Sequence, residues 1–224
     1  MPEELGNLSN SQVGETLSWK EVWISAITQP STATYERILQ DPKSSANRAY
    51  GWVFISSLAG GAIGILISNI MPGESEIYPG FSPIASTLCL PVLAVISVIG
   101  LAISAGITQL VASALGGTGT YSKLVYAWAA YLAPLGFISS VIASIPLVNI
   151  LGFPLVIYGM VLNVIAVKAV HQFGWGRAIA SSVLILVGIT VLVAVFVILV
   201  LVILGPAIGN VFSNIIQGLE TPVP

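Results

Sequence analysis

The stretch ILVGITVLVAVFVILVLVIL, residues 185–204, contains no charged residue and only one glycine, Gly188. About 20 consecutive apolar residues are enough for a helix to cross the hydrocarbon core of a bilayer. The stretch therefore predicts a transmembrane helix, and its Val, Ile and Leu side chains are expected to face lipid or a partner helix. The whole chain agrees: 56% of its 224 residues are hydrophobic and 7% are charged, whereas a soluble domain is about 25% charged.

Four further stretches have the length and composition of membrane spans. With the first stretch they predict five helices, at residues 50–70, 86–114, 124–144, 148–170 and 179–204. Only residues 145–147 separate the third span from the fourth. A single helix through both would carry a proline in its middle, so Pro146 predicts a tight turn between two antiparallel helices.

The basic residues lie on alternate connections between these spans. They are Lys20, Arg37, Lys43, Arg48, Lys123, Lys168 and Arg177. The connections at 71–85 and 145–148 and the tail at 205–224 contain no Lys or Arg. Because basic residues concentrate on the cytoplasmic side of membrane proteins, we expect a cytoplasmic N-terminus and, with five spans, an extracytoplasmic C-terminus.

The segment before the first span predicts short amphipathic helices. Ser18 followed by Glu21 matches a capping box. Behind this cap, apolar residues recur at helical spacing until Pro30: Trp19, Val22, Trp23, Ala26 and Ile27. We expect Trp19, Trp23 and Ile27 to contact either the lipid interface or the protein's own inner loops.

A second short helix is predicted near residues 32–39. Asp41 and Pro42 then match the cap and first residue of the helix that leads into the first span. The chain is thereby divided into a polar N-terminal tail (1–16), a cytoplasmic amphipathic headpiece (17–48), a five-helix transmembrane domain (49–204) and a short extracytoplasmic tail (205–224). The predicted fold class is all-α: a polytopic helical membrane protein with five transmembrane helices preceded by short amphipathic interfacial helices.

Small residues repeat every four positions along the first two spans. The repeats are Ser56, Gly60, Gly64 and Ser68 in the first span and Gly100, Ser104, Thr108 and Ala112 in the second. Stripes of small residues let helix backbones approach closely in lipid. We expect these stripes, with Ser56, Gly60, Gly64, Gly100 and Ser104 as the packing positions, to serve contacts within the chain in preference to dimer contacts.

The sequence offers no residues for a catalytic, cofactor or metal site. His171 is the sole histidine, so neither a Ser-His-Asp triad nor a His-based metal site is expected. No Asp or Glu lies within a predicted span, which argues against paired-carboxylate chemistry. Basic residues form no stripe, so nucleic acid is not an expected partner. A transporter or channel would need convergent polar groups, which these spans lack.

Several motifs follow one another in a set order along residues 19–204. They are the segment from Trp19 to Pro30, LGGTGTY at 115–121, Tyr131 with Pro134, VKAVH at 167–171 and GRA at 176–178. In this order the chain resembles the Yip1 family of five-span membrane proteins. The resemblance implies a cytoplasmic N-terminus and a far-side C-terminus.

Eukaryotic Yip1 members act in early secretory traffic and engage small prenylated GTPases and one another. This chain has a short headpiece and no Asp-Leu-Tyr-Gly-Pro stretch before its first span. The difference argues against binding of a small GTPase. It points to the prokaryotic branch, and so to the plasma membrane.

These observations lead to the hypothesis of a non-enzymatic multi-pass membrane protein that organises the membrane or partner proteins, in trafficking, membrane shaping or scaffolding. Its expected partners are the lipid bilayer, other membrane proteins and further copies of itself. Two alternatives stay open. The chain could be an accessory subunit of a larger membrane complex that docks through the fifth span, or a small transporter or channel.

Overall fold

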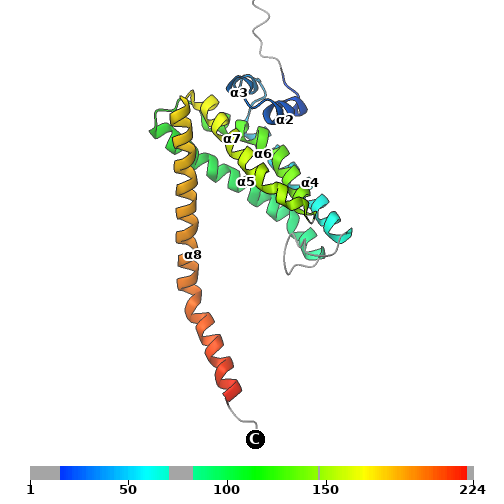
Figure 1. The fold of residues 1–224 in the computed structure, drawn as a ribbon, viewed down its shortest axis with the longest axis vertical. Coiled ribbons are helices and arrows are strands. Elements are labelled where there is room, and N and C mark those ends of the chain that lie inside the picture. Colours follow the sequence, from blue (N-terminus) through cyan, green and yellow to red (C-terminus); the bar gives the residue numbers. More distant parts are fainter. Residues whose placement is uncertain (1–15, 71–82, 146, 221–224) are drawn as a thin grey trace, which may run out of the picture. The chain divides into compact units, whose positions relative to one another are not determined.

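The computed structural model describes residues 16–70, 83–145 and 147–220, and its regular elements are helices (Figure 1). Two short helices come first, α2 (Trp19–Thr28) and α3 (Thr32–Leu39). The long helices are α4 (Ala46–Ile70), α5 (Pro83–Ala114), α6 (Tyr121–Ala143), α7 (Gly152–His171) and α8 (Trp175–Glu220), with a short 3₁₀ helix, η2 (Val148–Leu151), before α7. The predicted all-α class is confirmed.

Five helical segments within the described ranges are long and apolar enough to cross a membrane. They are Ala46–Ile67, Thr87–Ala114, Tyr121–Ala143, Val148–His171 and Trp175–Ile216. Each overlaps one of the five predicted spans, so the predicted number of spans is confirmed. The predicted turn at Pro146 lies outside the described residues, but α6 and α7 on either side are separate helices that pack against each other.

The start of α4 differs from the prediction. Asp41 and Pro42 do not begin the first span, because α4 starts at Ala46. The Asp41 carboxylate instead accepts a hydrogen bond from the Lys43 backbone N–H at 2.9 Å, which stabilises a turn. Ser45 takes the capping position, since its Oγ accepts a hydrogen bond from the Arg48 backbone N–H at 3.3 Å.

Residues 1–182 and 183–224 form two compact units. In the first unit α6 is central. It packs against α4, α5 and α7 and also contacts the headpiece helices α2 and α3. Residues 124–131 of α6 are all buried, and three of them are alanines, whose small side chains permit close helix contacts from several sides.

The second unit consists of the rest of α8. The predicted fifth span ends at residue 204, whereas α8 continues through Gly205 and Pro206 to Glu220. Large apolar side chains are exposed along this part of the helix. After Pro206 they recur at helical spacing, at Ile208, Val211, Phe212, Ile215 and Ile216. One apolar face results, a pattern typical of helices that lie at a membrane surface.

Gly60 permits α4 and α6 to approach closely. A Cβ atom at Gly60 would lie 3.0 Å from Ser140 Cβ and 3.4 Å from Phe137 Cα, both on α6. Contacts this short leave no room for a larger side chain unless one helix moves. At Gly60, the stripe of small residues on α4 therefore serves close packing against α6, as predicted for this position.

We expect Gly60→Leu to lower the melting temperature of the protein in mild detergent. The leucine side chain must push α4 away from α6, and overpacking of this kind typically costs about 1–3 kcal/mol. Gly188→Leu is the matched control, because a Cβ atom at Gly188 would meet no atom within 4 Å. Equal losses at the two glycines in a thermal unfolding assay would contradict a packing role for Gly60.

Candidate functional site

Helix α2 begins at the predicted capping box. The Ser18 backbone N–H donates to Glu21 Oε2 at 2.8 Å, and the Glu21 N–H donates to Ser18 Oγ at 3.3 Å. Hydrogen bonds from the Ser18 side chain and backbone to the Glu21 carboxylate hold the pKa of this carboxyl below its ordinary value. Both orphan donors at the start of the helix are thereby satisfied, so a helix of only ten residues can begin at a defined point.

The apolar sides of α2 and α3 pack into the first unit. Val22 and Ala26 of α2 are fully buried, as is Tyr35 of α3. The Tyr35 hydroxyl donates to the Ala26 carbonyl at 3.4 Å, and burial raises the pKa of this phenol, which keeps it neutral. The two helices are therefore packed together through their own side chains and against the helices that follow.

The three residues predicted as contacts at the interface have different surroundings. Trp19 is 46% exposed, whereas Trp23 and Ile27 are half-buried and pack against the core. The Tyr158 hydroxyl of α7 donates to the Ile27 carbonyl at 2.5 Å. Thus α2 is packed on the protein along one side and leaves Trp19 at the surface.

Four aromatic rings connect α2 to α4 and α6. The Trp19 and Trp23 ring centroids are 5.0 Å apart, those of Trp23 and Trp52 are 6.0 Å apart, and those of Trp52 and Tyr126 are 5.1 Å apart. The first two pairs are edge-to-face, which is a favoured geometry for aromatic rings. The rings join residues that are more than 100 positions apart in the sequence, so helical spacing alone could not reveal the contact.

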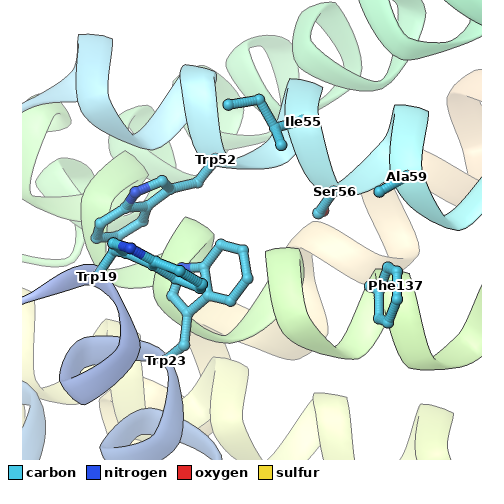
Figure 2. A pocket seen from close by; sticks show the side chains of 7 residues that line it. All are labelled: Trp19, Trp23, Trp52, Ile55, Ser56, Ala59 and Phe137. Carbon is cyan, nitrogen blue, oxygen red and sulfur yellow. The ribbon is translucent and has the colours of Figure 1, made fainter.

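A groove of about 540 Å³ lies beside these rings (Figure 2). We call it the tryptophan groove. Its lining comes from α2, α4 and α6: Trp19, Trp23, Trp52, Ile55, Ser56, Ala59 and Phe137. Figure 2 shows the three indole rings gathered at one end, with Ala59 and Phe137 at the other. Ser56, one of the predicted packing residues, therefore contributes to the groove lining.

Next to the groove, a partly buried ion pair connects the headpiece to the long helices. Arg48 Nη1 lies 2.8 Å from Asp41 Oδ2, and the Tyr126 hydroxyl donates to the same carboxylate oxygen at 3.2 Å. Arg48 Nη2 donates to the Leu17 carbonyl at 3.1 Å, and its guanidinium lies 4.8 Å from the centroid of the Trp52 ring. The Asp41 side chain is fully buried.

The Asp41–Arg48–Tyr126 cluster therefore joins four segments: the chain just before α2 at Leu17, the turn after α3, the first turn of α4, and α6. From the sequence, Arg48 is expected only as one of the basic residues on the connections and Asp41 as a helix cap, so the pair is not predicted. A signal was present, however. Both charges lie next to the first span, where an unpaired buried charge is costly and a partner should be sought.

A second, polar cleft lies between α3, the turn before α6 and the end of α7. It measures about 440 Å³, and its lining residues are Glu36, Leu39, Gln40, Thr118, Gly119, Thr120, Lys123, Ala169, Val170 and Gln172. Gln109 Nε2 donates to the Gly119 carbonyl at 2.7 Å, and Gln172 Nε2 donates to Glu36 Oε1 at 3.3 Å. These contacts hold three segments that are distant in sequence at the same end of the first unit.

The predicted packing residues fall into two groups. Ser56, Gly60 and Gly64 are buried along α4. Gly100, in contrast, is exposed on α5, and a Cβ atom there would meet no atom within 4 Å. Ser104 is half-buried, and its carbonyl accepts a hydrogen bond from the Thr108 hydroxyl at 2.7 Å. The structure thus brings Gly60 of the α4 stripe against α6, whereas no described residue lies close to Gly100 in this way.

In the part of the chain that the structure describes, no three His, Cys, Asp or Glu side chains come together in a way that could hold a metal ion. His171 is buried and stacks on Phe173, with ring centroids 5.5 Å apart. The groups that gather at the headpiece end are therefore aromatic rings, one ion pair and a polar cleft. Such groups can hold a ligand or a partner.

Comparison with protein families gives a match, whereas no curated protein and no solved structure matches the chain. The Yip1 domain matches residues 24–198, which is most of the chain. The matched range includes α3 to α7 in full. It contains the first four apolar helical segments and the first part of the fifth, together with the sequence motifs at 115–121, 131–134, 167–171 and 176–178 and most of the segment from Trp19 to Pro30. The chain therefore belongs to the Yip1 domain family and is a multi-pass integral membrane protein.

Proposed function

We propose that this Yip1-domain protein is a non-enzymatic organiser of the membrane, which holds lipid or partner membrane proteins at its headpiece end. One observation carries the proposal. The Asp41–Arg48–Tyr126 cluster fixes the headpiece helices beside an apolar groove that no described residue fills. A rigidly held headpiece with an exposed Trp19 can present this groove to its surroundings in one defined geometry.

The two headpiece helices need this support. Isolated helices shorter than about 12–15 residues are marginal in water, and α2 and α3 have 10 and 8 residues. Burial of Val22, Ala26 and Tyr35 and the ion pair beside them supply the missing stabilisation. A helix pair docked in this way next to a span is suited to work at the boundary between water and lipid.

We place the headpiece end in the cytoplasm and the C-terminus outside. The distribution of all seven basic residues over alternate connections supports this orientation. So does the polar cleft, where α3, Lys123 and the end of α7 meet at one end of the first unit. For a prokaryotic cell, the membrane concerned is the plasma membrane.

A second candidate function is that of an accessory subunit in a larger membrane complex. The observation in its favour is the row of exposed Val, Ile and Leu side chains along α8 from Val183 to Ile216. A partner helix could pack along this face, although lipid can equally cover it. The two candidate functions predict different binding surfaces. A membrane organiser should lose its partners when the headpiece is altered, and an accessory subunit should lose them when α8 is altered.

We expect the double variant Trp19→Ala plus Trp23→Ala to keep its five helices inserted while losing its partners. Burial of one aromatic side chain contributes on the order of 2 kcal/mol, so recovery of a bound partner should fall at least about tenfold. Limited proteolysis from the headpiece side should show faster cleavage before α4. Quantitative co-purification in mild detergent measures the loss of partners.

Trp175→Ala is the matched control for this double variant, because Trp175 is also exposed, at 56%, but lies at the start of α8. It should leave both the protease pattern and the co-purified partners unchanged. If the double variant keeps wild-type protease resistance and the same partners, the headpiece is not the working surface. A loss of partners on alteration of α8 alone would favour the accessory-subunit role.

A further inference from the structure

We propose that the tryptophan groove binds an acyl chain of an anionic membrane phospholipid, with the headgroup phosphate beside Lys20. The inference rests on the proposed function of the headpiece end and identifies a ligand for it. This ligand is a phospholipid of the surrounding bilayer. Three properties of the groove carry the proposal: its composition, its position beside exposed residues of the first span and the charge at its tryptophan end.

The lining of the groove is almost entirely hydrocarbon and aromatic. Ser56 is the only lining residue with a hydroxyl, and it is 5% exposed. A volume of about 540 Å³ falls within the range of about 300–1,000 Å³ that small-molecule sites occupy. An apolar site of this size with so few polar groups suits a hydrocarbon ligand.

The groove follows α4 from Trp52 to Ala59, which is seven residues or about 10 Å at 1.5 Å per residue. An unbranched hydrocarbon chain can lie along an apolar groove of this length.

The groove lies where lipid chains are available. Ile55 and Ala59 belong to the first membrane-crossing segment, and both are exposed, Ile55 by 62%. On a spanning helix, exposed apolar side chains face lipid. At the other end lie Trp19 and Trp23, from the helix that precedes the span, and tryptophan is the residue enriched at the headgroup level. A lipid tail can thus enter sideways, with its headgroup toward α2.

Positive charge lies at the tryptophan end of the groove. Lys20 Nζ is 5.5 Å from the centroid of the Trp19 ring, and the Arg48 guanidinium is 4.8 Å from that of Trp52. Arg48 is already paired with Asp41, so of these two cations Lys20 is the one that remains for a phosphate. A basic side chain at the membrane surface favours anionic lipid by about fivefold.

Tryptophan quenching by brominated lipid tests the proposal in the full-length protein. Trp175→Phe removes the exposed indole at the start of α8. Trp52 and Trp128 are buried, so Trp19 and Trp23 at the groove are the more accessible indoles that remain. The protein is reconstituted in phosphatidylcholine with a small fraction of dibromostearoyl phosphatidylglycerol. We expect quenching several times stronger than the fraction of brominated lipid predicts. Quenching in proportion to that fraction would overturn the proposal.

Two matched pairs of variants locate the effect. Ala59→Phe fills the groove and should reduce quenching to the proportional level, whereas Ala194→Phe adds the same bulk at an exposed alanine of α8 and should change nothing. Lys20→Glu should lower the preference for phosphatidylglycerol over phosphatidylcholine about fivefold. Lys43→Glu, at another exposed lysine of the headpiece, should not.

Each outcome decides one part of the proposal. Unchanged quenching in Ala59→Phe would overturn the acyl-chain site, and an unchanged lipid preference in Lys20→Glu would overturn the headgroup site. Lys20 is exposed, so the second variant is informative even if Ala59→Phe fails to fold. Failure of the lipid site with continued loss of partners in the Trp19→Ala plus Trp23→Ala variant would leave the proposed function in place.

Discussion

Arg48→Ala should release the headpiece helices from α4 and α6 and destabilise the protein by about 3–5 kcal/mol. The substitution leaves the Asp41 carboxylate buried without its cation, with only the Tyr126 hydroxyl and the Lys43 backbone N–H as donors. It also removes the hydrogen bond to the Leu17 carbonyl and the contact with the Trp52 ring. Removal of one member of a buried pair costs far more than loss of an exposed one.

Limited proteolysis of the segment between α3 and α4 should report this release, and thermal unfolding in detergent should report the lost stability. Lys43→Ala is the control, because Lys43 is exposed and only its backbone takes part in the turn. A double variant with Asp41→Asn should recover part of the stability, since it removes the unpaired charge. If Arg48→Ala unfolds and is cleaved like Lys43→Ala, the ion pair does not hold the headpiece.

Gly119→Ala should disrupt the polar cleft. A Cβ atom at Gly119 would lie 2.5 Å from both Val170 Cγ1 and the Val170 carbonyl oxygen. The Val170 side chain could rotate away, but its carbonyl belongs to the last turn of α7 and cannot move alone. The turn before α6 must therefore separate from α7, which also strains the 2.7 Å hydrogen bond from Gln109 to the Gly119 carbonyl. We expect a cost of about 3 kcal/mol, at the upper end for overpacking.

Gly174→Ala is the control for this substitution, because Gly174 lies on the short connection between α7 and α8 and a Cβ atom there would meet nothing within 4 Å. Only Gly119→Ala should lower the melting temperature appreciably. It should also speed proteolysis at the turn before α6. Equal melting temperatures for the two variants would show that the turn does not rest on α7 in the folded protein.

The helices themselves were predictable from sequence because a bilayer imposes a length and a composition on every span. Helix α2 was predictable for a different reason: its start at the Ser18–Glu21 capping box depends only on neighbouring residues. The start of α4 was not predictable in this way. Asp41 satisfies both a helix-cap pattern and a turn pattern, and its contacts with Arg48 and Tyr126 favour the turn.

The site could be predicted only in part. Spacing along α2 identified Trp19 and Trp23, but Trp52 and Phe137 lie on other helices, and their position beside α2 depends on how those helices rotate and pack. Helix rotation and packing also explain why Gly60 and Gly100 differ in the structure. Both lie on small-residue stripes, but of these two glycines only Gly60 faces a neighbouring helix. At the other end of the chain, Gly205 and Pro206 looked like the end of a helix. A helix in lipid can nevertheless continue through proline.

The arrangement of five spans with a cytoplasmic headpiece is tested most directly by labelling single cysteines in intact cells. In a Cys89→Ser background, a membrane-impermeant maleimide should label Ser75→Cys and Thr221→Cys. It should leave Thr118→Cys unlabelled until the membrane is permeabilised. Thr118 is exposed on the folded protein, so protection there must come from the membrane itself. Labelling of Thr118→Cys from outside intact cells would contradict the arrangement.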